Sequence, residues 1–335
     1  MAQAVRVSGL YEAEVAVPDQ SNSARVQGVV NALRSVIIKL TGDRAAPEKP
    51  DAGLILRSAE RYLLQYRYQE AGSSADPAAA SASPELRLWA QFSQGALDRD
   101  LRSAGLSLWG AERPSTLAWV AVNDGSGWRW AGGEDGAGWF QSQVEVHANR
   151  RGLGVIFPLH DLDDDARLAA SAVGDADIAA IRQASERYQP NTVLAVAIDV
   201  SAPDNGRARW SLLSGSEPES WNTEGGQSEE FVRAGMDTLA DRLSLRYAAA
   251  RASAEQGVVT VNVKAVNSAT GYARALNYLQ GMNSVTAVQV TEVAGDTVTF
   301  ALSVYGGADV VRQAIALGRV LEPASGSDNT YRLSP

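Results

Sequence analysis

One run of the sequence gathers a histidine and four carboxylates within six residues. It consists of His160, Asp161, Asp163, Asp164 and Asp165. Clustered carboxylates suit hard cations such as Ca²⁺ or Mg²⁺, and a pair of them can serve acid–base hydrolysis. The calcium-loop spacing, with its glycine and distal glutamate, is absent. The alternative is an acidic helix start, where carboxylates interact favourably with the helix dipole.

The second candidate is an aromatic segment rich in glycine, residues 123–139. Tryptophan beside arginine is typical of protein interfaces, and indole rings also stack on sugars. The alternative is that these tryptophans cover the edge of a sheet. We therefore take as candidate binding residues Trp128, Arg129, Trp130, Trp139, His160, Asp161 and Asp163.

Familiar catalytic patterns are missing. There are no cysteines and only two histidines, which removes thiolate nucleophiles, cysteine-ligated zinc and iron–sulfur clusters. The sequence has no Gly-x-Ser-x-Gly elbow, no phosphate loop ending in Gly-Lys-Ser/Thr and no Gly-x-Gly-x-x-Gly after a strand. We therefore expect no catalytic residues, no metal and no cofactor.

Composition limits the partners. The chain has 335 residues, 45% of them hydrophobic, and a net charge of −9. The acidic excess lies in residues 113–256, with 13 Lys+Arg against 21 Asp+Glu. Nucleic acid is therefore an unfavourable partner, because binding it requires clustered cations. No apolar run is long enough to span a membrane, and the first residues lack the pattern of a signal peptide.

The first third alternates between strand and helix patterns. We predict strands at 10–17 and 86–92, helices at 21–40, 53–68 and 96–104, and a surface loop at 71–83. Within the first helix, apolar residues recur at spacings of three and four, and Gly42 ends it.

The middle third indicates a sheet, partly parallel, that is flanked by helices. We predict strands at 116–122, 153–159, 192–200 and 209–213, and helices at 140–149, 178–188 and 228–247. Ligands tend to bind beyond the carboxyl ends of such parallel strands.

The last third has the order strand, helix, strand, strand, helix, strand. The segments are 258–266, 270–281, 285–293, 297–304, 308–317 and a final strand in one or two pieces at 320–321 and 331–333. This βαββαβ order is that of the ferredoxin-like motif. The fold class is thus α/β and α+β, in three modules at residues 1–112, 113–256 and 257–335.

Several phrases resemble a proteobacterial periplasmic family, the one catalogued as domain of unknown function 2066. They lie at 10–21, 39–44, 59–68, 86–92, 97–122, 151–164 and 316–323. The most specific is Leu-Trp-Gly-x-Glu-Arg-Pro at 108–114. The resemblance implies a periplasmic or envelope protein without its leader, and it supplies no catalytic residues. The middle region is also similar in element order to the N-terminal domains of envelope proteins.

These observations favour a non-catalytic binding or scaffold protein of the envelope, contacting a protein or a glycan. One alternative is a hydrolase of envelope glycans or peptides that uses carboxylates near 161–165. Another is a binding module that depends on a divalent cation. A cytoplasmic location is the alternative to the periplasm.

Overall fold

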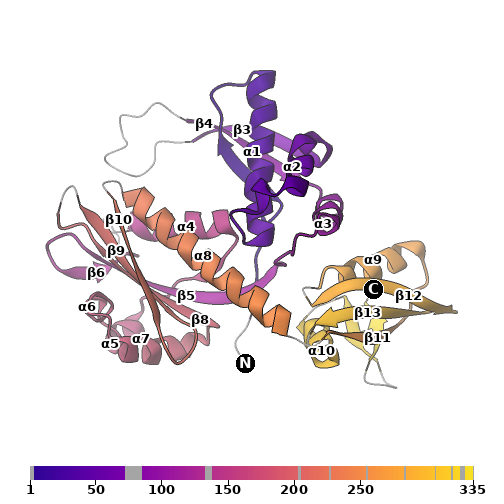
Figure 1. Ribbon diagram of the computed structural model, residues 1–335. Coiled ribbons are helices and arrows are strands. Elements are labelled where there is room, and N and C mark those ends of the chain that lie inside the picture. The colour runs from indigo at the N-terminus through magenta and orange to yellow at the C-terminus, as the bar shows by residue number, and fades with distance from the viewer. Residues whose placement is uncertain are drawn as a thin grey trace. The chain divides into compact units, whose positions relative to one another are not determined.

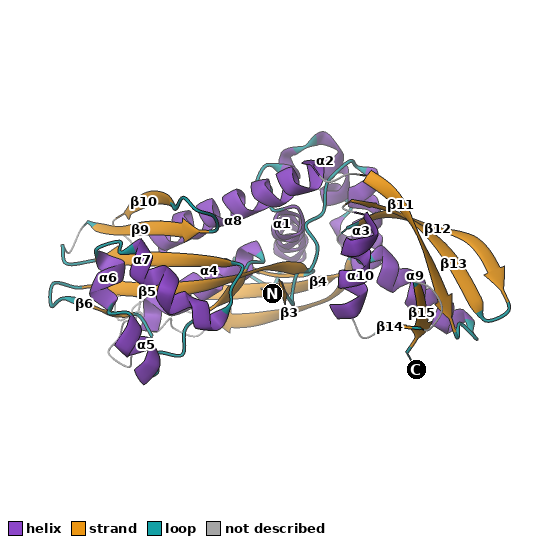
Figure 2. Ribbon diagram, turned by 90° about the horizontal axis from the view of Figure 1, so that it is seen from below, coloured by secondary structure: helices purple, strands orange, loops and turns teal. Residues whose placement is uncertain are grey.

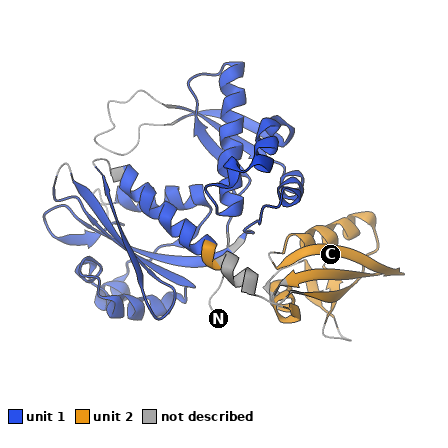
Figure 3. Cartoon of the chain, in the orientation of Figure 1, with its two compact units in different colours: residues 1–244 blue, residues 245–335 orange. Residues whose placement is uncertain are grey.

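The protein has a mixed α/β architecture (Figure 1). The computed structural model describes residues 4–71, 85–132, 138–202, 205–225, 228–253, 256–282, 284–305, 307–317, 320–324 and 329–334. The chain divides into two compact units, Met1–Ser244 and Leu245–Pro335 (Figure 3). The predicted loop at 71–83 lies outside the described residues except for its first position.

The first unit begins with a small antiparallel sheet in the order β2-β4-β3. Its elements are β2 (Glu12–Ala16), α1 (Asn22–Thr41), η1 (Ala46–Glu48), α2 (Pro50–Arg57), η2 (Ala59–Arg61), β3 (Leu63–Ala71), β4 (Glu85–Phe92) and α3 (Gln94–Ser103). Helix α1 starts where the Ser21 side chain accepts a hydrogen bond from the Ala24 N–H. It ends at Gly42, whose φ of 71° suits the left-handed region. Its buried stripe packs on the small sheet.

The predicted helix at 53–68 is wrong in its second half. Helix α2 ends at Arg57, and Leu63–Ala71 is the strand β3, which pairs antiparallel with β4. Leu64 and Tyr66 are exposed on this strand, at 64% and 44%.

A larger mixed sheet forms the rest of the first unit, and we call it the large sheet (Figure 2). Its strands run in the order β1-β5-β8-β9-β10, with β6 and β7 also pairing with β5. They are β1 (Ala4–Arg6), β5 (Glu112–Asn123), β6 (Trp128–Trp130), β7 (Gly154–Ile156), β8 (Thr192–Asp199), β9 (Gly206–Leu213) and β10 (Glu219–Gly225). Strand β5 is parallel to β7 and β8 and antiparallel to β1 and β6. The expected partly parallel sheet is confirmed.

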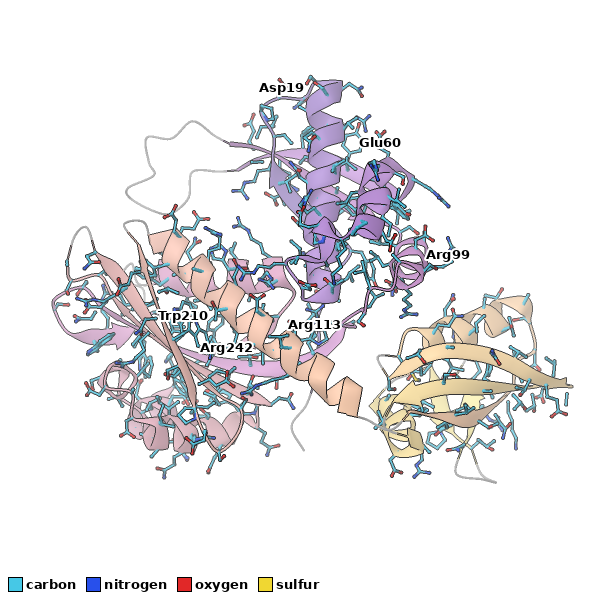
Figure 4. The ribbon with its side chains drawn as sticks, viewed as in Figure 1. Asp19, Glu60, Arg99, Arg113, Trp210 and Arg242 are labelled. Carbon is cyan, nitrogen blue, oxygen red and sulfur yellow. The ribbon has the colours of Figure 1, made fainter. Side chains whose placement is uncertain are left out.

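Helices cover both faces of the large sheet. They are α4 (Gly138–Arg151), α5 (Leu162–Arg167), α6 (Ala170–Gly174), α7 (Ile178–Ser185), η4 (Glu186–Tyr188) and α8 (Ser228–Ser253). Residues of α6, α7 and η4 pack with Trp119, Ala195 and Ala197 in one core cluster. Trp210 points to the opposite face, where α8 packs against its ring through Gly235 (Figure 4).

A buried arginine joins the two sheets of the first unit. Arg113, 1% exposed, lies in β5 and donates to the carbonyl oxygens of Lys39 at 2.5 Å and Arg151 at 3.3 Å (Figure 4). Its guanidinium stacks on Trp109, 4.1 Å from the ring centroid. Both carbonyls belong to the last turn of a helix, where a cation is favourable. These contacts cross residue 112, where the sequence predicts the end of the first module.

The second unit is a sheet in the order β12-β13-β11-β15-β14. Its elements are β11 (Gln256–Lys264), α9 (Ala269–Gln280), β12 (Val285–Ala294), β13 (Thr297–Tyr305), α10 (Gly307–Leu317), β14 (Leu321–Pro323) and β15 (Thr330–Leu333). Both helices pack on one face, in a core that includes Leu279, Phe300 and Ile315. In the described parts of the chain, no helix has both the length and the apolar composition needed to cross a bilayer.

Candidate binding site at the carboxyl edge of the large sheet

The parallel strands β5 and β8 end side by side, with Asn123 opposite Asp199. Directly paired residues of neighbouring strands share one face of a sheet. The register continues outward from this pair on both sides, to Trp128 in β6, Arg207 in β9 and Glu224 in β10. One row of five polar or aromatic side chains therefore crosses the sheet at the carboxyl ends of its parallel strands.

A pocket of about 450 Å³ lies over this row, on the face that carries α6. We call it the edge pocket. Its lining residues are Trp128, Gly174, Ala197, Asp199, Arg207, Ala208, Arg209, Asn222 and Glu224. The next row along the sheet, Ala197–Arg209–Asn222, forms its inner side. The volume falls within the range typical of small-ligand pockets, and open α/β sheets bind ligands at this edge.

The end of α6 fixes the wall of the pocket. A Cβ atom on Gly174 would lie 2.3 Å from Cε2 of Trp128, so only glycine allows the indole to lie this close. Arg209 donates from Nη2 to the carbonyl oxygens of Val173, at 3.2 Å, and Gly174. The indole and one guanidinium are therefore held in place by the same helix end.

The turn before Trp128 is closed by its own side chains. Asn123 Oδ1 accepts from the Gly125 N–H at 3.0 Å, and Asp124 Oδ1 accepts from the Ser126 hydroxyl at 2.6 Å. Arg129 donates to Asp124 Oδ2 at 2.5 Å. The hydrogen bonds from Ser126, with that from Arg129, hold the pKa of Asp124 far below its usual range. Arg129 thus stabilises the turn and does not line the edge pocket.

The pocket holds both donors and acceptors. Asp199 Oδ1 accepts from the Ser201 hydroxyl at 2.6 Å and its N–H at 3.0 Å, which lowers the pKa of this carboxyl. Asp199 is therefore ionised at neutral pH. The side chains of Arg207, Asn222 and Glu224 are exposed. Within the described residues, these three side chains make no hydrogen bond or ion pair, so they are available to a ligand.

Trp130 and His160 belong to a different cluster. The ring of Trp130 lies 5.3 Å from that of Trp119 and 4.9 Å from that of His160, between centroids. Trp119 is fully buried and donates from Nε1 to Ser185 Oγ at 2.9 Å. Trp130 and His160 therefore pack against the core of the large sheet.

Two carboxylates of the acidic run, Asp161 and Asp164, are bound to neighbouring side chains and backbone. Asp161 caps α5, accepting from the Asp164 N–H at 3.0 Å, and both its carboxylate oxygens accept from Arg187, at 2.8 and 2.9 Å. Arg187, with the Asp164 N–H, lowers the pKa of Asp161 to about 2. Asp164 is fully buried and accepts from Arg187 at 2.9 Å and from the Tyr188 hydroxyl at 2.6 Å. Asp163 lies exposed on the first turn of the helix.

Trp139 lies away from the edge pocket. Trp139, at the start of α4, makes an edge-to-face contact with Phe140 at 4.9 Å between centroids. It does not line the edge pocket. Across the part of the chain that the structure describes, no group of three or more His, Cys, Asp or Glu side chains is placed to hold a metal ion.

A second pocket, of about 440 Å³, lies at the opposite end of β8. Its arginine, Arg182, donates to the carbonyl oxygens of Gly215 at 2.6 Å and Ser216 at 3.3 Å. Because this cation already has backbone partners, the second pocket offers less to a ligand than the edge pocket does.

Sequence reasoning found Trp128 and missed the other polar residues of the edge pocket. The sequence position of Asp199 could have identified it as a binding residue, because it ends a buried strand next to another strand that ends in Asn123. The positions of Arg207, Asn222 and Glu224 gave no comparable indication. They meet through the register of β9 and β10, and no strand was predicted at Glu219–Gly225.

Comparison with known protein families adds one match. Residues 4–110, which contain the small sheet and α1–α3, match a family described as a domain of unknown function (DUF8605). This match supports an uncharacterised domain at residues 4–110. The matched family is a different one from domain of unknown function 2066, which the sequence phrases resemble. No curated protein matches the chain.

Proposed function

We propose that this chain is a binding protein that recognises a polar partner through the edge pocket. The observation that carries the proposal is the row Trp128–Asn123–Asp199–Arg207–Glu224. It gathers an indole, a cation and two carboxylates at the carboxyl ends of parallel strands, and within the described chain the side chains of Arg207 and Glu224 make no hydrogen bond or ion pair.

The acidic run favours binding over hydrolysis for this chain. A glycoside hydrolase needs one carboxylic acid that is protonated when it reaches the substrate. The ion pair with Arg187 keeps Asp161 ionised, and the buried oxygens of Asp164 are already bound to Arg187 and Tyr188. These carboxylates are used to fix the loop and the start of α5, and the same engagement leaves them poorly placed to bind a cation.

We extend the proposal to location. The phrases that resemble a proteobacterial periplasmic family support an envelope protein, and the lack of cysteine is compatible with that compartment. Fractionation of the native host tests this point. Recovery with periplasmic markers is expected, and recovery with cytoplasmic markers alone would contradict it.

We also propose three modules, the last of them ferredoxin-like. The order β11-α9-β12-β13-α10-β14 follows the βαββαβ motif, which supports this assignment. Strand β15 would then be an addition, because it lies between β11 and β14 and is parallel to β11. An experimental structure of the chain tests the assignment through the pairing of β15.

The binding proposal is tested by recovery of envelope components on the immobilised protein. The test variant combines Arg207→Ala with Glu224→Gln, both at exposed positions. The control is Arg57→Ala, which removes an exposed arginine of α2. We expect at least one component that wild type and control retain and the test variant loses. Identical recovery by all three proteins would contradict the proposal.

A further inference from the structure

The charges that line the edge pocket cancel. Two arginines, Arg207 and Arg209, face two carboxylates, Asp199 and Glu224. In the outer row the signs alternate from strand to strand, with Arg207 between Asp199 and Glu224, and in the inner row Arg209 lies between Ala197 and Asn222. For a ligand with a strong net charge of either sign, attraction to one pair is offset by repulsion from the other, so the pocket offers it no net attraction. The electrostatics therefore favour a ligand without net charge.

Donors and acceptors alternate over the same short distance. Guanidinium groups only donate hydrogen bonds, ionised carboxylates only accept them, and the Asn222 amide does both. A hydroxyl group donates one hydrogen bond and accepts others. A ligand with several hydroxyl groups on a rigid ring can thus use donors and acceptors from Arg207, Asn222 and Glu224 together.

The apolar part of the lining is small and includes one large ring. Trp128 is its only large apolar side chain, and the other apolar positions are Ala197, Ala208 and Gly174. Such a lining offers no deep cavity for the side chain of an apolar peptide residue. It does offer an indole beside polar groups, an arrangement suited to the mixed apolar and hydroxylated surface of a sugar ring.

We infer that the edge pocket binds an uncharged saccharide, with Trp128 as the stacking surface and Arg207, Asn222 and Glu224 as hydrogen-bonding groups. The inference rests on the proposed function and names its ligand class. Arg209 serves as a positioning residue, because its Nη2 is bound to the end of α6.

Calorimetric titration of the whole chain tests the inference. The probes are neutral disaccharides of hexoses and of N-acetylhexosamines, a disaccharide containing a uronic acid, and triglycine as a zwitterionic peptide. Each is titrated into wild type, Arg207→Ala, Glu224→Gln and the Arg57→Ala control, at low and high NaCl. Circular dichroism confirms that each variant is folded.

We expect a neutral disaccharide to bind wild type and the control, and to bind each pocket variant roughly tenfold more weakly or worse. Its affinity should change less than about twofold with salt, since no ion pair forms between ligand and protein. If only the uronic acid or the peptide binds, and Arg207→Ala abolishes that binding, the saccharide inference is overturned while the binding function stands. If no probe binds, the inference is overturned, and the recovery experiment above decides the function separately.

Discussion

Arg151 is a buried cation that connects two helices of the first unit. Its side chain is 6% exposed, and it donates to Asp237 Oδ1 at 2.6 Å and Asp241 Oδ1 at 2.8 Å in α8. It also donates to the carbonyl oxygen of Gly42 at 3.1 Å. One guanidinium therefore links the end of α1 with α8.

We predict that Arg151→Ala lowers the free energy of unfolding by about 3 kcal/mol, because Asp237 loses its nearest cation, and Asp241 and the Gly42 carbonyl each lose one of their donors. The neighbouring Arg150→Ala is the control. Arg150 is 44% exposed in its side chain, and its ion pair among the described residues is with Glu229, at 3.7 Å, so we expect a loss below about 1 kcal/mol. Urea denaturation measures both, and equal effects would contradict the assignment.

His147 gives the chain a dependence on acid pH. It is 2% exposed, its Nε2 has no hydrogen-bond partner within the described residues, and burial, reinforced by Arg150, lowers its pKa to about 4. Between pH 6.5 and 4 the unfolded chain therefore binds a proton at this residue that the folded chain does not. The contribution of His147 to stability is lost as pH falls through this window.

We predict that the difference in unfolding free energy between wild type and His147→Leu changes by about 2–3 kcal/mol from pH 7 to pH 4, with wild type losing more. Titration of the variant against wild type by chemical denaturation at each pH isolates this residue from the carboxylates. A difference independent of pH would show that His147 is protonated alike in both states.

At the scale of elements, alanine substitution at two helical glycines should change stability in opposite directions. A Cβ atom on Gly235 of α8 would lie 2.0 Å from the Trp210 ring, whereas one on Gly53 of α2 would meet nothing within 4 Å. We expect Gly235→Ala to destabilise by about 1–3 kcal/mol through overpacking. We expect Gly53→Ala to stabilise by about 0.5–1 kcal/mol, the usual gain for helical alanine. Thermal melts compare the two, and a gain from Gly235→Ala would contradict the packing of α8 on the large sheet.

Helices and strands whose caps and apolar patterns lie within the segment itself could be predicted from the sequence. Helix α1 was readable because its cap, its apolar stripe and Gly42 agree, and β5 and β8 because a continuous apolar run marks a strand buried on both faces. Strand β3 was misread as helix because apolar residues from Leu54 to Tyr66 fall near helical spacing. Pairing with β4, a tertiary interaction, decides its conformation.

The sequence patterns do not predict strands β6 and β10. The polar residues that these strands bring to the edge pocket could therefore not be grouped into one site. Strand β6 has three residues and β10 is mostly polar, and the conformation of both depends on pairing with β5 and β9. Trp128 was identifiable from its residue type, but the neighbours that give it a role are set by cross-strand register. That register is long-range information, which no local pattern in the chain contains.

For the whole molecule, the two compact units have separate cores. The second unit packs its sheet and helices around residues such as Phe300, which is fully buried in a cluster of its own. Replacing a large side chain in such a core with a small one removes packing contacts within that core only. Disturbance of one core should therefore leave the hydrogen bonds of the other intact.

We predict that Phe300→Ala in the full chain destabilises the second unit by about 3–5 kcal/mol. Hydrogen exchange should show faster exchange in β11–β13 and unchanged protection in β5 and β8. Loss of protection in both units together would show that they unfold as one.

The central claim, that the edge pocket is where this protein meets its ligand, is tested most directly inside the native host. A photo-crosslinking amino acid is placed at Asn222, which lines the pocket, and in a matched protein at Glu60, an exposed position in η2 of the same unit. We predict an adduct of defined mass from position 222 that Arg207→Ala abolishes, and none of that mass from position 60. The same adducts from both positions, or an adduct at 222 that is indifferent to Arg207, would contradict the account.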